Sequence, residues 1–194
     1  MSAEVPKKNL LGNVAAFFSS HRIGNLALLL LALLGVYLFA YRGGRFFLVP
    51  SISMEHTLLE GDQIVTLRPA VYRRGDIVVL HDPENPKEDF LVKRITGLGG
   101  DSIGVRGGAL FLNGTYASEP YIVEPMVYEI ADPIAIPEGE VFIMGDNRNY
   151  SEDSSSTLQT VPEALLVGKV IFIYFPFERM GPVYSYPLTN AKGE

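Results

Sequence analysis

The chain has 194 residues, a formal net charge of −6 and no cysteine. The negative charge argues against a nucleic-acid partner, because contact with a phosphate backbone favours a basic surface. The absence of cysteine excludes a cysteine nucleophile, disulfide bonds and thiolate zinc sites. The length is enough for one domain and a short additional segment.

Residues 23–41 carry no charged side chain, whereas residues 1–22 are polar and mildly basic. A helix of this length rises about 1.5 Å per residue and spans roughly 30 Å, which matches the hydrocarbon core of a bilayer. A cleaved signal peptide would have a shorter apolar core followed by small residues at positions −3 and −1. A buried core helix is the other alternative. We predict a cytoplasmic segment over 1–22 and an uncleaved transmembrane anchor over 23–41.

From residue 61 onward, short β-branched runs alternate with turns that contain glycine or proline. This spacing is typical of antiparallel sheets. The strongest hairpin signal is Asn113-Gly114, which follows an apolar run. We therefore predict a mostly β fold: a coiled antiparallel sheet or partial barrel over 42–180, preceded by the single transmembrane helix and followed by a C-terminal tail over 181–194.

Two stretches of the sequence suggest a hydrolytic site. Ser51 and Ser53 lie in a short loop, and Lys93 lies between Leu91 and Ile95 on one face of a predicted strand. Desolvation in such a place lowers the pKa of a lysine, which can then act as a neutral base that activates a serine hydroxyl. The alternative is an edge lysine that extends its charged end into water. We predict a Ser53–Lys93 dyad.

The chain has three histidines, and none of them is well placed for a Ser-His-Asp triad. His21 precedes the predicted anchor, and His81 follows a strand in a polar, solvated stretch. His56 lies three residues after Ser53, and we expect it to be a surface residue beside the cleft.

Four motifs occur in a fixed order along the chain. They are Ser51-x-Ser53-Met54-x-x-Thr57-Leu58, Gly75-Asp76-Ile77-Val78-Val79, Lys93-Arg94-Ile95-x-Gly97-Leu98-x-Gly100-Asp101 and Gly145-Asp146-Asn147-Arg148-x-x-Ser151-x-Asp153-Ser154. Together, over about residues 35–175, they resemble bacterial type I signal peptidases. These are membrane-anchored Ser–Lys proteases that remove signal peptides from exported preproteins.

The resemblance implies a role for each matching residue. Ser53 would be the nucleophile and Lys93 the general base, while the Ser53 amide and the Ser51 hydroxyl would stabilise the oxyanion. Ser151 would hydrogen-bond to the lysine and orient it. The remaining matches would support the site: Met54, Arg94, Asp146, Asn147, Arg148 and Asp153.

The resemblance also implies a location and a substrate class. The substrates would be exported preproteins with small residues at −1 and −3, and the enzyme would need neither a metal nor a cofactor. A single-pass anchor would hold the catalytic domain on the extracytoplasmic face of the cytoplasmic (inner) membrane. A slight excess of basic residues before residue 23 agrees with this orientation. Phe46, Phe47 and Leu48 would contact the lipid bilayer.

Two positions depart from the family pattern. His56 stands where the family usually has proline, and Ser155 stands where an arginine would pair with Asp153. Two other functions remain as hypotheses. One is a Ser–Lys autoprotease of the repressor type, which shares the β core but would carry a DNA-binding domain instead of an anchor. The other, which the missing arginine supports, is a catalytically decayed, membrane-anchored binding module.

Overall fold

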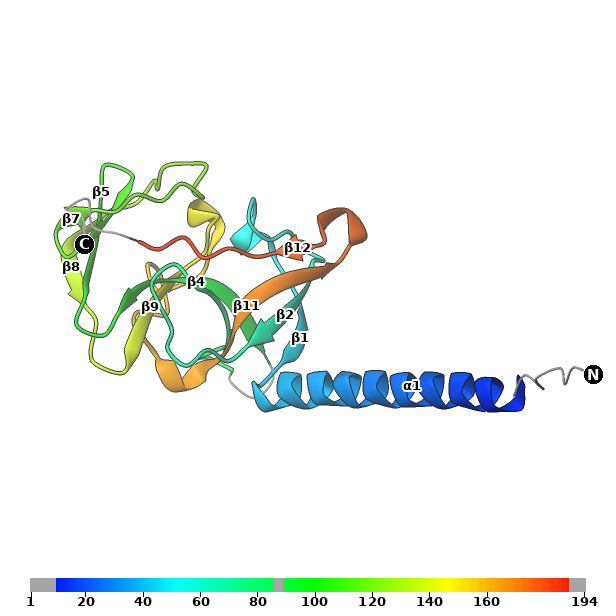
Figure 1. Cartoon of the computed structure of the whole chain (residues 1–194). Coiled ribbons are helices and arrows are strands. Elements are labelled where there is room, and N and C mark those ends of the chain that lie inside the picture. Colours follow the sequence, from blue (N-terminus) through cyan, green and yellow to red (C-terminus); the bar gives the residue numbers. More distant parts are fainter. Residues whose placement is uncertain (1–9, 86–88, 189–194) are drawn as a thin grey trace, which may run out of the picture. The chain divides into compact units, whose positions relative to one another are not determined.

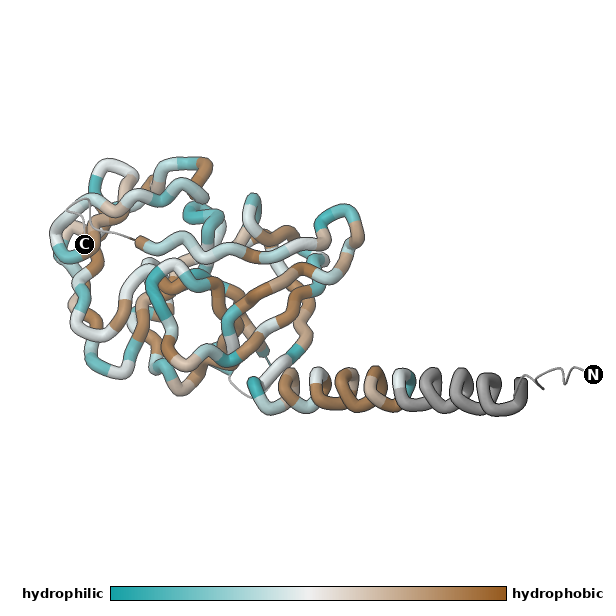
Figure 2. Tube along the Cα trace, viewed as in Figure 1, coloured by the Kyte–Doolittle hydropathy of each residue, from teal (hydrophilic) through white to brown (hydrophobic). Residues whose placement is uncertain are grey.

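The computed structural model describes residues 10–85 and 89–188 and divides the chain into two units, residues 1–41 and 42–194. Within the first unit, α1 (Leu10–Tyr41) begins well before the predicted anchor at residue 23 (Figure 1). Its segment Gly24–Tyr41 is apolar, unburied and long enough to cross a membrane (Figure 2). Those properties suit a membrane span or a signal sequence better than a buried core helix.

The larger sheet of the second unit is antiparallel and has the strand order β1-β2-β11-β3-β4-β9-β10, with β12 paired to β11. Its strands are β1 (Arg45–Leu48), β2 (Gln63–Leu67), β3 (Ile77–His81), β4 (Phe90–Leu98), β9 (Glu140–Met144), β10 (Val161–Pro162), β11 (Leu166–Phe175) and β12 (Gly181–Pro182). Register shifts interrupt the pairing of β11 with β2 and with β3, and the pairing of β4 with β9. Such bulges bend strands and increase their twist, and the sheet curls accordingly (Figure 1).

The smaller sheet has the order β7-β6-β5-β8. Its strands are β5 (Ser102–Arg106), β6 (Ala109–Leu112), β7 (Thr115–Tyr116) and β8 (Ile130–Ala135). Asn113 and Gly114 join β6 to β7 with φ values of 54° and 74°, the left-handed backbone that a two-residue hairpin turn requires. The hairpin predicted from Asn113-Gly114 is confirmed, and so is the mostly β, antiparallel fold class.

Short 3₁₀ turns connect the strands of the larger sheet. They are η1 (Ile52–Met54), η2 (Arg148–Tyr150), η3 (Glu163–Leu165) and η4 (Phe177–Arg179). Met54 and Leu58 are fully buried in the same apolar cluster as Val79 and Val170. Because side chains within η1 and just after it are fixed in the core, the loop that carries Ser53 is held in place by packing.

The stretch from Gly181 to Leu188, predicted as the beginning of a tail, packs onto the domain. The amide of Val183 donates to the Ile171 carbonyl over 3.0 Å, and Leu188 is only 4% exposed within the core of the smaller sheet. Gly75, with φ +86°, lies so close to the Tyr186 carbonyl that a Cβ atom there would overlap it. The packed domain therefore extends to at least residue 188.

Candidate active site

Ser53 lies in η1. This turn begins directly after Ser51, whose backbone is extended (φ −152°, ψ 169°). The side chain of Ser53 is largely buried, and 8% of the residue remains exposed. The Oγ atoms of Ser51 and Ser53 are 3.3 Å apart. Two hydroxyl groups thus meet at the start of a short helical turn, where the first amides have no partner within the turn.

Lys93 lies in β4, between β3 and β9, and is 3% exposed. Its Nζ donates a hydrogen bond of 3.0 Å to Oγ of Ser151. Burial lowers the pKa of Lys93 below its usual value, because it disfavours the ammonium form, and the negative charges of Asp153, Glu152 and Asp82 only partly oppose this. The expectation of a buried rather than an edge lysine is confirmed.

A cleft of about 520 Å³ brings the predicted reactive residues together. Ser51, Ser53, Lys93 and Ser151 all line it, and Leu91 contributes an apolar wall. These residues come from η1, from β4 and from the segment after β9, so three distant parts of the sequence form a single concave site. A cleft with apolar walls and a few convergent polar groups is typical of an enzyme site.

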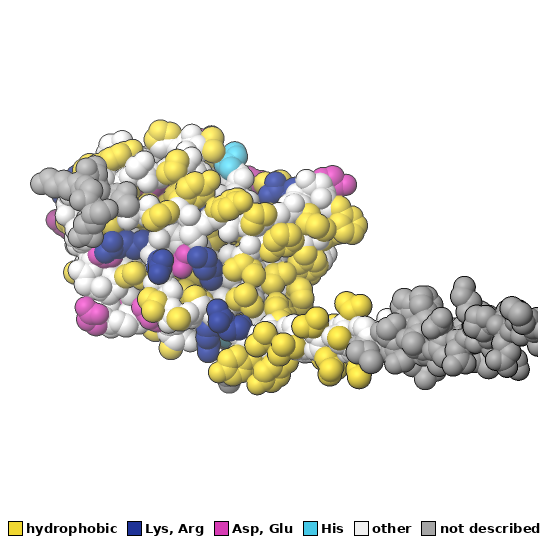
Figure 3. Space-filling view, viewed as in Figure 1, with side chains coloured by type: hydrophobic (Ala, Val, Ile, Leu, Met, Phe, Trp, Pro, Cys, Tyr) yellow, Lys and Arg dark blue, Asp and Glu magenta, His cyan; other side chains and the backbone are white. Residues whose placement is uncertain are grey.

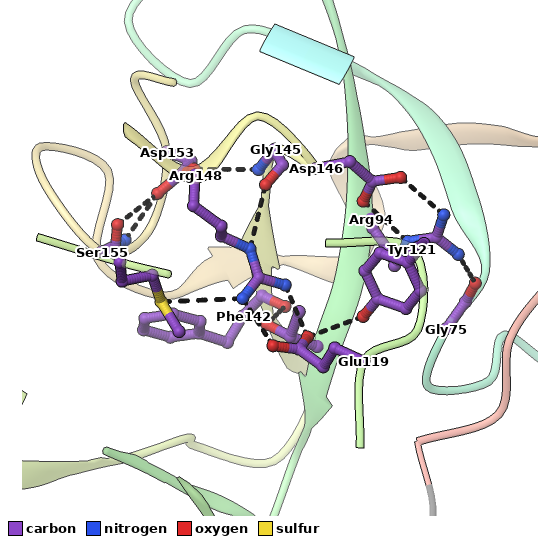
Figure 4. Close-up of polar contacts among 12 residues, drawn as sticks. Gly75, Arg94, Glu119, Tyr121, Phe142, Gly145, Asp146, Arg148, Asp153 and Ser155 are labelled. Carbon is purple, nitrogen blue, oxygen red and sulfur yellow. Dashed lines mark hydrogen bonds and ion pairs between the residues drawn. The ribbon is translucent and has the colours of Figure 1, made fainter. Parts of the chain in front are cut away.

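Arg94 and Asp146 form a buried ion pair (Figure 4). Arg94 donates to Asp146 through Nε at 2.8 Å and Nη2 at 2.6 Å, and its Nη1 donates to the Gly75 carbonyl at 2.8 Å. The Thr57 hydroxyl, four residues after Ser53, donates to the same carboxylate. Residues from all four sequence motifs therefore meet at this pair.

Arg148 is paired with Glu119, a residue that sequence reasoning missed. Its two terminal nitrogens lie 2.6 and 2.5 Å from the carboxylate oxygens, and its Nε donates to the Gly145 carbonyl at 3.1 Å. Glu119 also accepts a hydrogen bond of 2.6 Å from Tyr121. Glu119 and Tyr121 lie between β7 and β8 and outside every motif, so the sequence offered no signal for either of them.

Gly145 lies between the nucleophile loop and Ser151. A Cβ atom at this position would overlap both the Ser53 carbonyl and the Ser151 side chain. Asn147 lies two residues further along this loop. Its backbone amide donates to the Ser53 carbonyl at 3.0 Å, and its side-chain amide donates to the Ile52 carbonyl at 3.2 Å. The motif Gly-Asp-Asn-Arg therefore docks directly onto η1.

Asp153 is fully buried and has hydrogen-bond donors in place of the arginine that the resemblance implies. Its carboxylate accepts from the Gly145 amide at 2.9 Å, the Ser155 amide at 2.9 Å and the Ser155 hydroxyl at 2.7 Å. The Ser155 hydroxyl is also 3.0 Å from the Tyr128 hydroxyl. Ser155 thus supplies neutral donors to Asp153.

His56 is exposed and has a φ of 76°. Proline cannot adopt this left-handed backbone, since its ring fixes φ near −65°, so the loop differs in conformation from one that carries proline there. His56 borders a second cavity of about 260 Å³, which shares Ile52, Asn149 and Tyr150 with the cleft. The surface position predicted for His56 is confirmed.

The expectation of a solvated loop position for His81 is wrong. This residue ends β3 and packs against Phe90, with 4.8 Å between ring centroids. Within residues 10–85 and 89–188, no three His, Asp or Glu side chains are grouped to hold a metal ion. The independence from metals and cofactors that the resemblance implies stays a prediction.

Comparison with known proteins agrees with the four motifs. The family described as "Signal peptidase, peptidase S26" matches residues 22–175. Probable signal peptidase I-1 of Synechocystis sp. is 32% identical over 178 residues, which cover 87% of this chain and 90% of that protein. Signal peptidase I of Bacillus licheniformis is 34% identical over 147 residues, or 69% and 78% of the two chains.

A plant relative and a solved structure are also similar. Thylakoidal processing peptidase 1 of Arabidopsis thaliana is 37% identical over 158 residues, which cover 75% of this chain and 46% of that protein. The crystal structure of a signal peptidase I from Enterococcus faecalis has a TM-score of 0.46 and 27% identity, covering 51% of this chain and 96% of that chain. From the family match over residues 22–175 and the identities to the Synechocystis and Bacillus proteins, the chain belongs to the signal peptidase family, peptidase S26.

Proposed function

We propose that this peptidase cleaves the N-terminal signal peptides of exported preproteins with Ser53 as nucleophile and Lys93 as general base. The observation that carries the assignment is the buried Lys93, whose Nζ is held by Ser151 in a cleft that Ser53 also lines. Burial and a lowered pKa are the properties that a lysine needs in order to accept a proton from a serine.

The first step joins Ser53 to the substrate. Oγ of Ser53 attacks the scissile carbonyl carbon while neutral Lys93 takes the hydroxyl proton. The negative charge that develops on the carbonyl oxygen is stabilised by the Ser53 amide and the Ser51 hydroxyl. Lys93 then gives its proton to the leaving amine, and the mature protein departs. An acyl-enzyme remains on Ser53.

The second step releases the signal peptide. Lys93 is again neutral and takes a proton from a water molecule, which attacks the acyl carbon. Collapse of the second tetrahedral intermediate returns the proton to Ser53. Throughout both steps the Ser151 hydroxyl keeps Nζ oriented, as their 3.0 Å contact suggests. Proton transfer through one lysine accounts for both halves of the reaction without a metal or a cofactor.

The same proposal places the domain at a lipid surface on the extracytoplasmic side, with residues 1–22 in the cytoplasm and 23–41 in the bilayer. Phe46 and Phe177 are 60% and 73% exposed. Phe46 packs edge-on against Tyr174, and Phe177 packs edge-on against Phe175, so exposed aromatic rings occur on β1, β11 and η4. Figure 3 shows apolar side chains gathered over β11 and η4. Exposed apolar patches mark contact sites for membranes or other partners, and the proposal assigns this one to the membrane.

Purified full-length protein in lipid vesicles, incubated with a preprotein that has alanine at −1 and −3, tests the assignment. Ser53→Ala and Lys93→Met should each abolish cleavage while the protein remains folded. Ser118→Ala, at an exposed serine between β7 and β8, is the control and should cleave like the parent. Cleavage by Ser53→Ala at the parental rate would refute the nucleophile, and loss of activity in all three would refute the site assignment.

A further inference from the structure

Two buried ion pairs lie side by side (Figure 4), and only one of them is built entirely from motif residues. The Arg94–Asp146 pair is fully buried. In the second pair, Arg148 is fully buried and the side chain of Glu119 is 7% exposed. Glu119 comes from the connection between β7 and β8, which belongs to the smaller sheet. That connection therefore supplies the counter-ion for a motif arginine of the larger sheet.

Glu119 fixes the position of Arg148 at the start of η2. Its carboxylate binds both terminal nitrogens of the guanidinium, and the remaining nitrogen donates to the Gly145 carbonyl. Burial alone would lower the pKa of Arg148, but attraction to Glu119 and their hydrogen bonds raise it overall, so the guanidinium stays charged. Arg148 is thus clamped from both sides.

The turn that contains Arg148 is adjacent to the residue that binds Lys93. η2 comprises Arg148–Tyr150, and Ser151 follows it immediately. Oγ of Ser151 accepts the 3.0 Å hydrogen bond from Lys93. Any shift of Arg148 is therefore transmitted over one short turn to the hydroxyl that orients Nζ.

Glu119 is also linked, through Tyr121, to the Arg94–Asp146 pair. Its Oε1 accepts from the Tyr121 hydroxyl, and the Tyr121 ring lies 3.8 Å from the guanidinium carbon of Arg94 (Figure 4). Arg94 in turn holds Asp146, which accepts the Thr57 hydroxyl from the nucleophile loop. One carboxylate of the smaller sheet thus reaches both the Ser151 turn and the Ser53 loop.

We propose that Glu119 is a positioning residue for catalysis, because its carboxylate holds η2 where Ser151 can orient Lys93. This inference rests on the proposed role of Lys93 as general base. Without the carboxylate, Arg148 becomes a buried cation without a counter-ion and must move toward water. A displacement of about 1 Å in catalytic groups can cost about 10²-fold in rate.

The test compares Glu119→Gln with the parent full-length chain in detergent, using a peptide that spans a signal-peptide cleavage site. We expect kcat to fall at least about tenfold with KM within about twofold, since the interaction serves the reaction more than substrate binding. The rising limb of kcat/KM should move to higher pH, because water that reaches Lys93 restores part of its usual pKa. Glu129→Gln, at an exposed carboxylate of the same connection that accepts from the Gly107 amide, should behave like the parent.

A purely structural role for Glu119 predicts a different pattern. The double variant Glu119→Gln/Arg148→Gln removes both buried charges, so its melting temperature should recover even if Glu119→Gln alone folds poorly. If Glu119 positions the turn, kcat of the double variant stays low and the pH limb stays displaced. Recovery of kcat together with stability would overturn the proposal, as would a parental kcat and pH limb in Glu119→Gln.

Lys93→Met, measured in the same series, separates the two proposals. If Lys93→Met is inactive while Glu119→Gln matches the parent, only the role of Glu119 is wrong. If Lys93→Met retains activity, the general-base assignment is wrong, and the role of Glu119 falls with it.

Discussion

Nζ of Lys93 lies 3.0 Å from Oγ of Ser151, a residue 58 positions further along the chain. The contact joins the middle of β4 to the segment after η2, and both line the cleft that holds Ser53. Neither side chain is reactive by itself. Their meeting inside the curled sheet removes the ammonium from water while leaving it one hydrogen-bond partner, and the following predictions depend on that arrangement.

The activity of the peptidase should depend on pH through Lys93. Because the base must be neutral, kcat/KM should rise with pH and level off once Lys93 is deprotonated. The pKa of this rising limb should lie below the usual lysine value of 10.5. Burial is the cause of the lowering. The measurement is kcat/KM of the full-length enzyme on a cleavage-site peptide across the alkaline range. A limb at the usual lysine value would mean that Lys93 is not desolvated during turnover.

Lys93→Met should stabilise the domain at neutral pH. A lysine whose folded pKa is lowered costs stability as pH falls through its unfolded value, about 10.4, and the cost stops growing below the folded pKa. Methionine keeps an apolar side chain of similar length and carries no charge. We therefore expect the variant to exceed the parent in urea midpoint at pH 7 and to approach it at high pH. A lower midpoint at pH 7 would contradict this.

Gly145→Ala should disrupt the site for lack of space. Gly145 has no left-handed backbone, but a Cβ atom would overlap the Ser53 carbonyl and the Ser151 side chain. Moving either group by about 1 Å should reduce kcat by about 10²-fold. Gly104→Ala is the matched control, because its Cβ would be 3.4 Å from its nearest neighbour, the Ile130 carbonyl. Equal kcat in the two variants would mean that the loop can shift without affecting catalysis.

Substitutions at His56 should affect stability without removing activity. Since φ is +76° there, glycine relieves backbone strain, and His56→Gly should leave stability unchanged or raise it by about 1 kcal/mol. His56→Pro forces a different φ and should destabilise by more than about 1 kcal/mol. Thermal melting and peptide cleavage check both. Loss of cleavage in a well-folded His56→Gly variant would make this histidine part of the chemistry.

A fragment of residues 42–194 should bind lipid vesicles without α1. Transfer of one phenylalanine from water to an apolar phase is worth about 1.5–3 kcal/mol. Phe46→Ser/Phe177→Ser should therefore weaken partitioning onto phosphatidylglycerol-containing vesicles by at least about tenfold. Tyr116→Ser, at a tyrosine of the smaller sheet that is 51% exposed, is the control. Equal partitioning of both variants and the parent would contradict the proposal that β1 and η4 contact the membrane.

The fold class could be predicted from short strand and turn signals, and the Ser53–Lys93 pair from a lysine within an apolar strand. The family resemblance added Ser51 and Ser151, which line the same cleft. Partners that depend on long-range packing could not be predicted. Glu119 is one acidic residue in an irregular stretch, and only the return of the β7–β8 connection across the larger sheet brings it to Arg148. For the same reason, nothing local showed that Leu188 would fill the core of the smaller sheet.

The partners of Asp153 could not be predicted for a different reason. The resemblance drew attention to an absent cation, whereas the buried Asp153 is satisfied by amide and hydroxyl donors. A carboxylate needs hydrogen bonds when it is buried, and these can come from neutral groups. Which groups supply them depends on loop geometry, which the order of residues alone does not reveal.

The position of β11 between β2 and β3 has a consequence for biosynthesis. β2 and β3 are close in sequence but do not pair with each other. Each has one edge that pairs with β11, which begins at Leu166. At about 5–20 residues per second, the ~100 intervening residues take roughly 5–20 s to translate. Until then both strands expose unpaired edges, which favour pairing with other chains. The nascent peptidase should therefore depend on chaperones until β11 is made.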